Sequence, residues 1–226
     1  PSDTDARETA LKTMDRIRYP VRPQDVFTEA NTWGSSTGWL EHRDAAGEES
    51  VLAELESAKD LGIDLVQIDD GWQGDDYASW TPCAARYPQG WQRVEERARA
   101  LGVQLGLWAA VGGRNPVACE DLQRNFDQAG FVWTKLDFAH APNRQAVDRL
   151  TGLARAFLLY TDHAARINWD ATEVAPRYGY WFAREYGAIY FANRKPAFPT
   201  NAIYRPHTVL RDLWQLSTYV NLLKFL

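Results

Sequence analysis

Three short stretches of the sequence place carboxylates directly after apolar runs. LVQIDDGW ends in Asp69 and Asp70 before its glycine, WTKLDF carries Lys135 and Asp137, and INWD ends in Asp170. Adjacent carboxylates repel each other and resist dehydration, so at the end of a strand they make sense mainly if something outside the strand uses them. Lys135 and Asp137 alternate by two, which points both side chains to one side of a strand. A turn at the paired aspartates and a structural ion pair at the lysine are the alternatives.

Carboxylates beside aromatic rings suit carbohydrate chemistry. The chain has 10 Trp, 10 Tyr and 9 Phe, and we expect exposed rings in loop-like stretches such as DGWQGDDYASW. Sugar C–H faces stack on such rings, while carboxylates accept hydrogen bonds from hydroxyls. In a retaining glycosidase one carboxylate attacks the anomeric carbon and a second carboxyl group protonates the departing oxygen. Beside Lys135 we expect Asp137 to stay ionised, as a nucleophile must.

The proton donor has two candidates, Asp170 and Glu173. Asp170 follows an apolar strand, so partial burial would raise its pKa towards that of a general acid, and a turn or helix cap is the alternative. His140 lies close to the nucleophile candidate, but the chain has no HxH or HExxH spacing, so we expect a surface or hydrogen-bonding histidine. The two cysteines lack CxxC spacing. We therefore predict neither a metal nor a cofactor.

The elements that must position these residues follow one repeated pattern. Gly62, Gly102 and Gly130 each lie between an amphipathic helical segment and an apolar run, in LAELESAKDLGIDLVQID, VEERARALGVQLGLWA and LQRNFDQAGFVWTKLDF. Glycine at this point predicts a left-handed helix cap followed by a strand. Repeated helix-to-strand units with short links favour a parallel sheet covered by helices.

About six β/α units can be counted, which predicts an α/β fold of the TIM type, a (β/α)8 barrel that normally has eight units. We expect strands over 26–33, 65–69, 103–108, 131–138, 166–169 and 188–192, and further helices over 144–156 and 208–223. Residues 1–226 would form one domain, with 1–25 as a leading segment. Because an open barrel exposes strand edges, the chain is expected to be part of a longer protein, unless the unit count is wrong. A doubly wound sheet is the alternative, without its usual GxGxxG motif.

Composition narrows the partners. The formal net charge of -5 and the mixed distribution of charges give no electrostatic reason to expect a nucleic acid. No apolar run approaches the roughly 18 residues needed to span a bilayer, and the first 20 residues lack a signal core, so we expect no membrane partner and either a cytoplasmic protein or one that has lost a leader. The expected partner is an oligosaccharide or glycoside substrate, and a homo-oligomer is compatible with the sequence.

Four motifs occur in an order that resembles the melibiase family, the α-galactosidases: NTWG, DLGIDLVQIDDGW, RYPQGWQRVEERARALGVQLGLW and KLDF, within roughly residues 26–140. The resemblance implies a (β/α)8 catalytic domain that cleaves terminal α-linked galactose, or a closely related α-glycoside, with retention. It also implies that Asp137 is the nucleophile and that the sugar is held by Asp69, Asp70, Trp72, Trp108 and Lys135, with Trp33 near the barrel mouth.

The chain departs from this family after the nucleophile. Ala139 stands where the family usually has an asparagine, and in the loop after the fifth strand only Arg177 corresponds to an expected sugar-binding arginine. The segment AIYFANRKPAFPT, where the family's acid/base residue would fall, contains no carboxylate. Asp170 is therefore the first candidate for the donor within the chain, and a donor beyond Leu226 is the alternative if the chain is part of a longer protein. A noncatalytic carbohydrate-binding barrel that has lost its acid is the alternative function.

Overall fold

Six parallel strands form one sheet in the order in which they occur in the chain. The computed structural model describes residues 2–35, 41–170, 185–189, 206–218 and 221–224. The strands are β1 (Glu29–Asn31), β2 (Leu65–Ile68), β3 (Gln104–Ala110), β4 (Trp133–Asp137), β5 (Arg166–Trp169) and β6 (Ala188–Ile189). Each strand pairs in parallel with the next. A sequential order is typical of a (β/α) barrel, whereas a doubly wound sheet reverses direction at a switch point. Within the described residues, no pairing joins β6 to β1.

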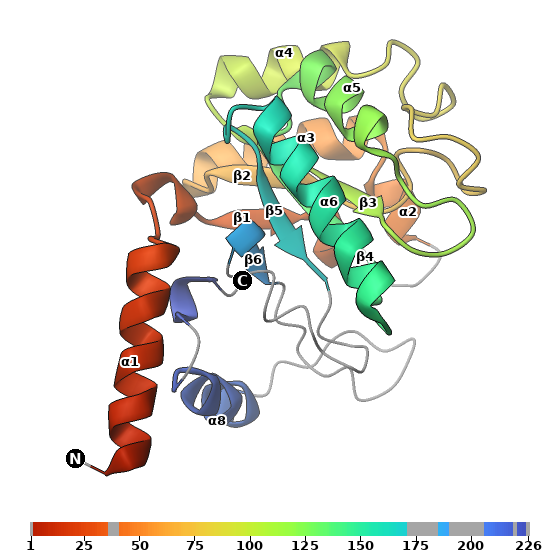
Figure 1. Ribbon diagram of the computed structural model, residues 1–226. Coiled ribbons are helices and arrows are strands. Elements are labelled where there is room, and N and C mark those ends of the chain that lie inside the picture. The colour runs from red at the N-terminus through yellow and green to blue at the C-terminus, as the bar shows by residue number, and fades with distance from the viewer. Residues whose placement is uncertain (1, 36–40, 171–184, 190–205, 219–220, 225–226) are drawn as a thin grey trace.

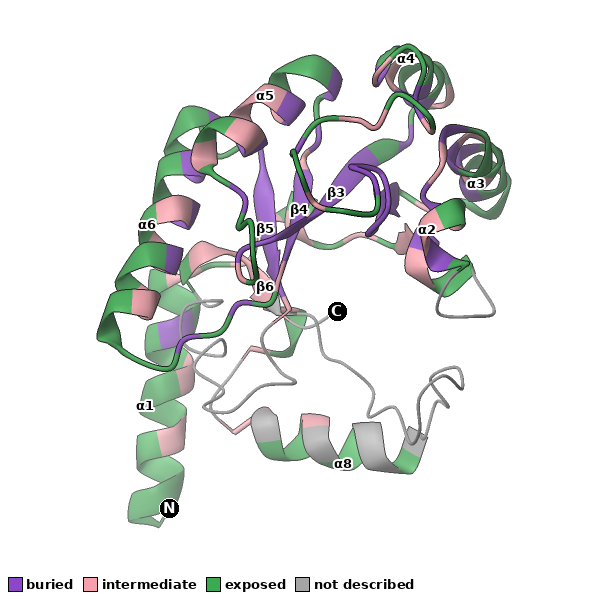
Figure 2. Ribbon diagram, turned by 90° about the vertical axis from the view of Figure 1, so that its right-hand side faces the viewer, coloured by how far each residue is buried: buried purple, intermediate pink, exposed green. Residues whose placement is uncertain are grey.

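The connecting helices cover one face of this sheet. Figure 2 shows α3, α4, α5 and α6 as an arc around the buried strands, while α1 and α8 lie apart from that arc. The α-helices are α1 (Asp3–Arg18), α2 (His42–Ala45), α3 (Glu48–Leu61), α4 (Gln92–Leu101), α5 (Cys119–Ala129), α6 (Arg144–Tyr160) and α8 (Pro206–Leu216). Short 3-10 helices occur at η1 (Pro23–Asp25), η2 (Thr32–Ser35) and η3 (Leu222–Lys224). The arrangement of alternating strands and helices confirms the predicted α/β class (Figure 1).

The three predicted helix caps are confirmed. Gly62, Gly102 and Gly130 end α3, α4 and α5 with φ of 72°, 70° and 66°. In each case the backbone N–H of the glycine donates to a carbonyl of the last helical turn, which satisfies a group that the helix itself leaves unpaired. The strands that follow begin within three residues of the caps.

Several boundaries differ from the prediction. The first strand, expected over 26–33, is confined to β1 because the chain turns into η2 at Thr32, and Val26 is 62% exposed. The helix expected over 144–156 continues to Tyr160, and the one expected over 208–223 is divided into α8 and η3. Part of the expected strand 188–192 lies outside the described residues. The leading segment contains α1, which begins where Ser2 accepts from the backbone N–H of Asp5 and the Asp5 carboxylate accepts in return.

The core lies between the sheet and the arc of helices. Val66 and Ile68 of β2 are fully buried and pack with Val51 and Leu55 of α3 in one cluster of apolar side chains. Among the described residues, no helix combines the length and the apolar character needed to cross a bilayer.

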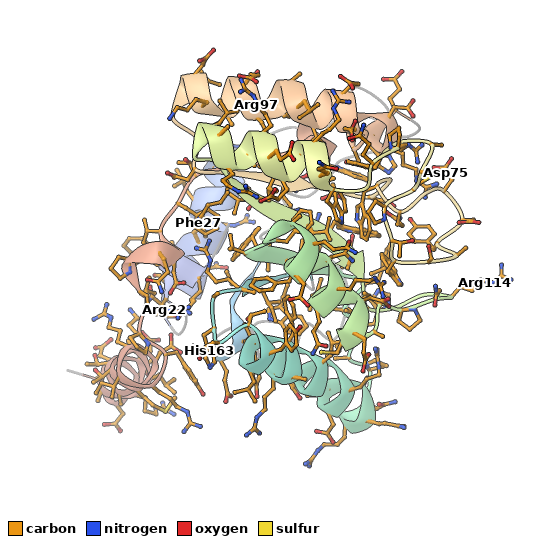
Figure 3. The ribbon with its side chains drawn as sticks, turned by 90° about the horizontal axis from the view of Figure 1, so that it is seen from above. Arg22, Phe27, Asp75, Arg97, Arg114 and His163 are labelled. Atoms are coloured by element: carbon orange, nitrogen blue, oxygen red, sulfur yellow. The ribbon has the colours of Figure 1, made fainter. Side chains whose placement is uncertain are left out.

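The two ends of the sheet are distinct. Seen from above, Asp75 in the loop after β2 and Arg114 in the loop after β3 project on one side, whereas Phe27 before β1 and His163 before β5 lie towards the other (Figure 3). The loops that follow the strands therefore share one rim, where barrel enzymes carry their ligands.

Candidate active site

Lys135 joins three strands at this rim. Its Nζ lies 3.1 Å from Oδ2 of Asp69, which follows β2, and 3.6 Å from Oδ2 of Asp170, which follows β5. The register explains the meeting, because Lys135 is the Cα partner of Trp108 on β3 and of Asn168 on β5. The residue is 5% exposed, so these contacts form in a shielded environment where charges interact strongly.

Asp69 is held by groups from its own segment as well as by the lysine. The amide of Gln67 donates to its Oδ2 at 3.2 Å, and the backbone N–H of Asp70 donates to Oδ1 at 2.9 Å. Its own backbone N–H donates to the hydroxyl of Thr32 at 2.9 Å, which ties the end of β2 to the segment after β1. The carboxylate is thus fixed in position before any ligand meets it.

Asp137 lies at the end of β4 and is held by two donors. The indole Nε1 of Trp108 donates to Oδ2 at 3.0 Å, and the backbone N–H of Phe138 donates to Oδ1 at 2.6 Å. Burial raises the pKa of Asp137 above its ordinary value, against the charge of Lys135 and the two hydrogen bonds, which lower it. The sequence predicts that the charge of Lys135 keeps Asp137 ionised, but burial has the larger effect on its pKa in this shielded site.

Asp70 faces a second cluster rather than Lys135. Burial alone would raise the pKa of its carboxyl group, but hydrogen bonds and the charge of Arg43 outweigh burial and hold the pKa below the ordinary value. Its carboxylate accepts hydrogen bonds from Gln73 Nε2 at 2.7 Å and Tyr77 OH at 2.8 Å, and lies 3.2 Å from both His42 Nε2 and Arg43 Nε.

Gly71 allows α2, the helix that carries His42 and Arg43, to lie close to Asp70. A Cβ at Gly71 would lie 2.6 Å from the Cα of Arg43, and the backbone there has φ of +124°, which side chains rarely adopt. The DDG triplet therefore does more than form a turn. Its aspartates provide acceptors, and its glycine admits α2 against the second of them.

The tryptophans near the rim are buried, whereas the sequence suggested exposed rings. Trp72, Trp80 and Trp108 are 1%, 3% and 2% exposed. Trp72 donates from Nε1 to the backbone oxygen of Trp108 at 2.9 Å, and its ring centroid lies 5.3 Å from that of Trp91. These large rings pack on one another because the loops fold back over them, and their N–H groups find acceptors inside the protein. Trp72 thus supports Trp108 from behind, and Trp108 reaches the site through its N–H.

The remaining predicted residues have different places. Trp33 is half-buried in η2 at the same rim, with its ring 4.3 Å from that of His42. His140 is exposed, and Phe138 beside it is 44% exposed. Arg177 and Glu173 lie outside the described residues, so their roles stay predictions.

Two features of the site had no signal in the sequence. His42, Arg43 and Tyr77 gather around Asp70 from positions 7 to 28 residues away, and no spacing marks them. Glu29 of β1 lies where the charges of Lys135 and Asp69 act on it, and burial raises its pKa to about 7 although the lysine lowers it. The sequence alone cannot distinguish this glutamate from an ordinary surface residue, because its burial depends on the assembled sheet. Within the described part of the chain, no group of three or more His, Cys, Asp or Glu side chains could hold a metal ion.

Sequence and structure comparisons both indicate similarity to α-galactosidases. No protein-family profile matches the chain. Over 67 residues it is 37% identical to α-galactosidase AgaA from Geobacillus stearothermophilus, a match that covers 27% of this chain and 9% of the relative. The predicted resemblance to α-galactosidases is confirmed.

Solved α-galactosidases share the fold. The Thermus thermophilus enzyme TtGalA in complex with stachyose superposes with a TM-score of 0.58 at 15% identity, over 94% of this chain and 64% of that chain. α-Galactosidase I from Mortierella vinacea gives 0.58 at 17% identity, over 76% and 49%. A variant of AgaA in complex with raffinose gives 0.54 at 17% identity, over 74% and 31%. The chain therefore spans less than two thirds of the length of each of these α-galactosidases.

Proposed function

We propose that the protein is a glycoside hydrolase that removes terminal α-linked galactose, or a closely related sugar, with retention of configuration. The observation that carries the proposal is the meeting of Asp69, Asp170 and Lys135 beside Asp137, from three strands, at the rim where barrel enzymes act. The relatives crystallised with stachyose and raffinose support the same substrate class. Tightly held carboxylates and a lysine are suited to sugar hydroxyls, since each accepts or donates hydrogen bonds from a fixed place.

In this proposal Asp137 is the nucleophile. Its carboxylate forms a bond to the anomeric carbon as the bond to the leaving oxygen breaks, and a carboxylic acid gives that oxygen its proton. Water then attacks the glycosyl ester and returns its proton to the same acid, which releases the sugar with its original configuration. Trp108 and the backbone of Phe138 orient the carboxylate for attack.

The sugar would be bound by the groups around the nucleophile. Lys135 and Asp69, paired at 3.1 Å, would each bind a hydroxyl, and Asp70, whose pKa is held low by its own cluster, would accept a further one. Trp33 at the rim offers an aromatic face. Arg177 is kept as a proposed contact on the strength of the resemblance alone.

Asp170 is the proposed proton donor among the described residues. The second candidate function is a carbohydrate-binding barrel without turnover, and the proximity of Asp170 to Lys135 favours it. An ammonium group 3.6 Å away stabilises the charged carboxylate, which has no proton to donate. In a hydrolase, a hydroxyl of the substrate would have to draw Lys135 away before Asp170 could act as an acid.

The proposal is tested by incubating the full-length protein with aryl α-galactosides. Aryl β-galactosides and aryl α-glucosides are the controls. We expect release only from the α-galactosides, and we expect ¹H NMR to detect the α-anomer of galactose first. Asp137→Gly should lose turnover by about 10³-fold or more and form a galactosyl azide when azide replaces the carboxylate. Absence of turnover in the wild type, with galactose affinity that survives Asp137→Ala, would favour the binding barrel.

Asp170→Asn separates the donor role from simple binding. If Asp170 is the acid, its loss slows substrates with poor leaving groups far more than those whose leaving group departs without a proton, such as a dinitrophenolate. A uniform loss across leaving groups, with weaker galactose binding, would instead make Asp170 a hydroxyl acceptor.

A further inference from the structure

A hollow of about 650 Å³ opens beside the nucleophile and is separate from the cluster around Lys135. Residues 76–78 of the loop after β2, Ala110 at the end of β3, residues 112–115 and Phe138 line it. Ala110 is the Cα partner of Asp137, and Phe138 follows Asp137 in the chain. Two residues that line the hollow are therefore direct neighbours of the proposed nucleophile. Its volume lies in the range of about 300–1,000 Å³ that small-molecule pockets occupy.

Two strained residues line this hollow. Four non-glycine residues have positive φ in the described part of the chain, and two of them are Tyr77, with φ of 54°, and Phe138, with φ of 53°. A left-handed backbone is unfavourable for an aromatic residue and persists where the surroundings enforce it. Because both strained residues line one cavity, we take the orientation of Tyr77 and Phe138 to serve a function there.

The loop after β3 enforces the conformation at Phe138. Gly112 packs so closely against it that a Cβ at Gly112 would lie 2.5 Å from the backbone oxygen of Phe138. The same oxygen accepts from the backbone N–H of His140 at 2.7 Å, which tightens the turn. The ring of Phe138 meets Trp108 edge to face, with centroids 6.3 Å apart, and remains 44% exposed.

Polar groups surround this exposed ring. Asn115 donates from its side chain to the backbone oxygen of Tyr77 at 2.8 Å and so joins the two loops that form the walls. Asp76 lines the same hollow, and Arg114 is exposed and projects from the rim (Figure 3). One apolar aromatic face bordered by a carboxylate and a guanidinium matches a sugar, which has a C–H face and a border of hydroxyls.

We infer that Phe138 is a specificity-determining residue that stacks against a sugar leaving group in this hollow. The inference rests on the proposed function, because it takes the galactose ring to lie over Asp137, Asp69 and Lys135. A leaving group attached to that ring must extend beyond the carboxylates, and the hollow beside Asp137 receives it. The substrate class is then a galactosyl oligosaccharide rather than a galactoside with a small or purely apolar leaving group.

Two substrates with the same galactosyl group test the inference in the full-length protein. Raffinose has a sugar leaving group, whereas α-galactosyl fluoride has a leaving group too small to reach Phe138. Phe138→Leu removes the aromatic face and keeps apolar bulk, and Phe138→Tyr is the matched control that keeps the ring. We expect Phe138→Leu to lower kcat/KM for raffinose at least tenfold more than for the fluoride, and Phe138→Tyr to keep the two losses within threefold of each other.

Arg114→Ala gives an independent measurement, since substitution of an exposed side chain usually changes stability little. It should also lower kcat/KM for raffinose relative to the fluoride, by about threefold or more. Equal losses of kcat/KM on both substrates, or no loss in either variant, would overturn the inference. Wild-type turnover of the fluoride would at the same time uphold the proposed function. A wild type that hydrolyses neither substrate overturns both.

Discussion

The indole N–H of Trp108 donates to Oδ2 of Asp137 at 3.0 Å, from β3 to the neighbouring β4. Trp108 is 2% exposed and its own backbone oxygen accepts from Trp72, so the donor is fixed by the packing behind it. A rigid donor of this kind both orients a carboxylate and stabilises its charged form.

Trp108→Phe should therefore raise the pKa of Asp137 further, because one of the groups that opposes the effect of burial is lost. We expect the acidic limb of the kcat/KM profile to move to higher pH by about one unit, since the nucleophile must be ionised. Trp80→Phe is the matched control, because Trp80 belongs to the same aromatic cluster but donates to the backbone of Asn115. An acidic limb that stays in place, or moves equally in the control, would contradict this role of Trp108.

Gly71→Ala should destabilise the protein by about 2–4 kcal/mol, because the new Cβ would collide with the backbone of Arg43 and force α2 away from Asp70. Gly90→Ala is the control: Gly90 also has positive φ, of +60°, but no atom lies within 4 Å of the position that a Cβ would take there. We expect about 1 kcal/mol for this variant, from backbone strain alone. Urea unfolding of the two variants measures the difference, and similar values would show that the close approach is unimportant.

Tyr77→Phe should cost about 1–2 kcal/mol, because Asp70 loses a donor at 2.8 Å and Arg43 loses the acceptor that its Nη2 reaches at 3.0 Å. The lowered pKa of Asp70 provides stability that is present above its unfolded pKa and is lost as pH falls through the folded pKa. The variant should therefore begin to unfold in acid at a higher pH. Tyr160→Phe, which removes an exposed hydrogen bond to Asp127, should change stability by only a few tenths of a kcal/mol.

Glu29→Gln should change how stability depends on pH. The folded pKa of about 7 lies above the unfolded value near 4.5, so the neutral form is favoured by folding and stability is lost as pH rises through this interval. A glutamine cannot ionise, so the variant should gain on the wild type by up to about 3 kcal/mol between roughly pH 5 and pH 8. Urea unfolding at several pH values measures this gain. A difference between the two proteins that does not vary with pH would place Glu29 in contact with water.

The repeated units were predictable from the sequence because their signals are local. A helix, a glycine that can adopt positive φ and an apolar strand are decided within about 20 consecutive residues, and Gly62, Gly102 and Gly130 act as predicted. The placement of Asp69, Lys135 and Asp137 at strand ends follows from the same local pattern. The first strand was predicted less well, since the turn into η2 depends on contacts with the end of β2 such as that between Thr32 and Asp69.

The sequence by itself determined the type of fold, the rim on which the carboxylates lie and the resemblance to α-galactosidases. Only the tertiary structure decided that Lys135 pairs with Asp69, 66 positions away, that Asp70 turns to His42 and Arg43, and that the tryptophans lie inside. These outcomes depend on which side chains the sheet and loops bring together and on how much water they exclude. Burial and electrostatic partnership belong to the assembled neighbourhood, so no short stretch of residues can encode them alone.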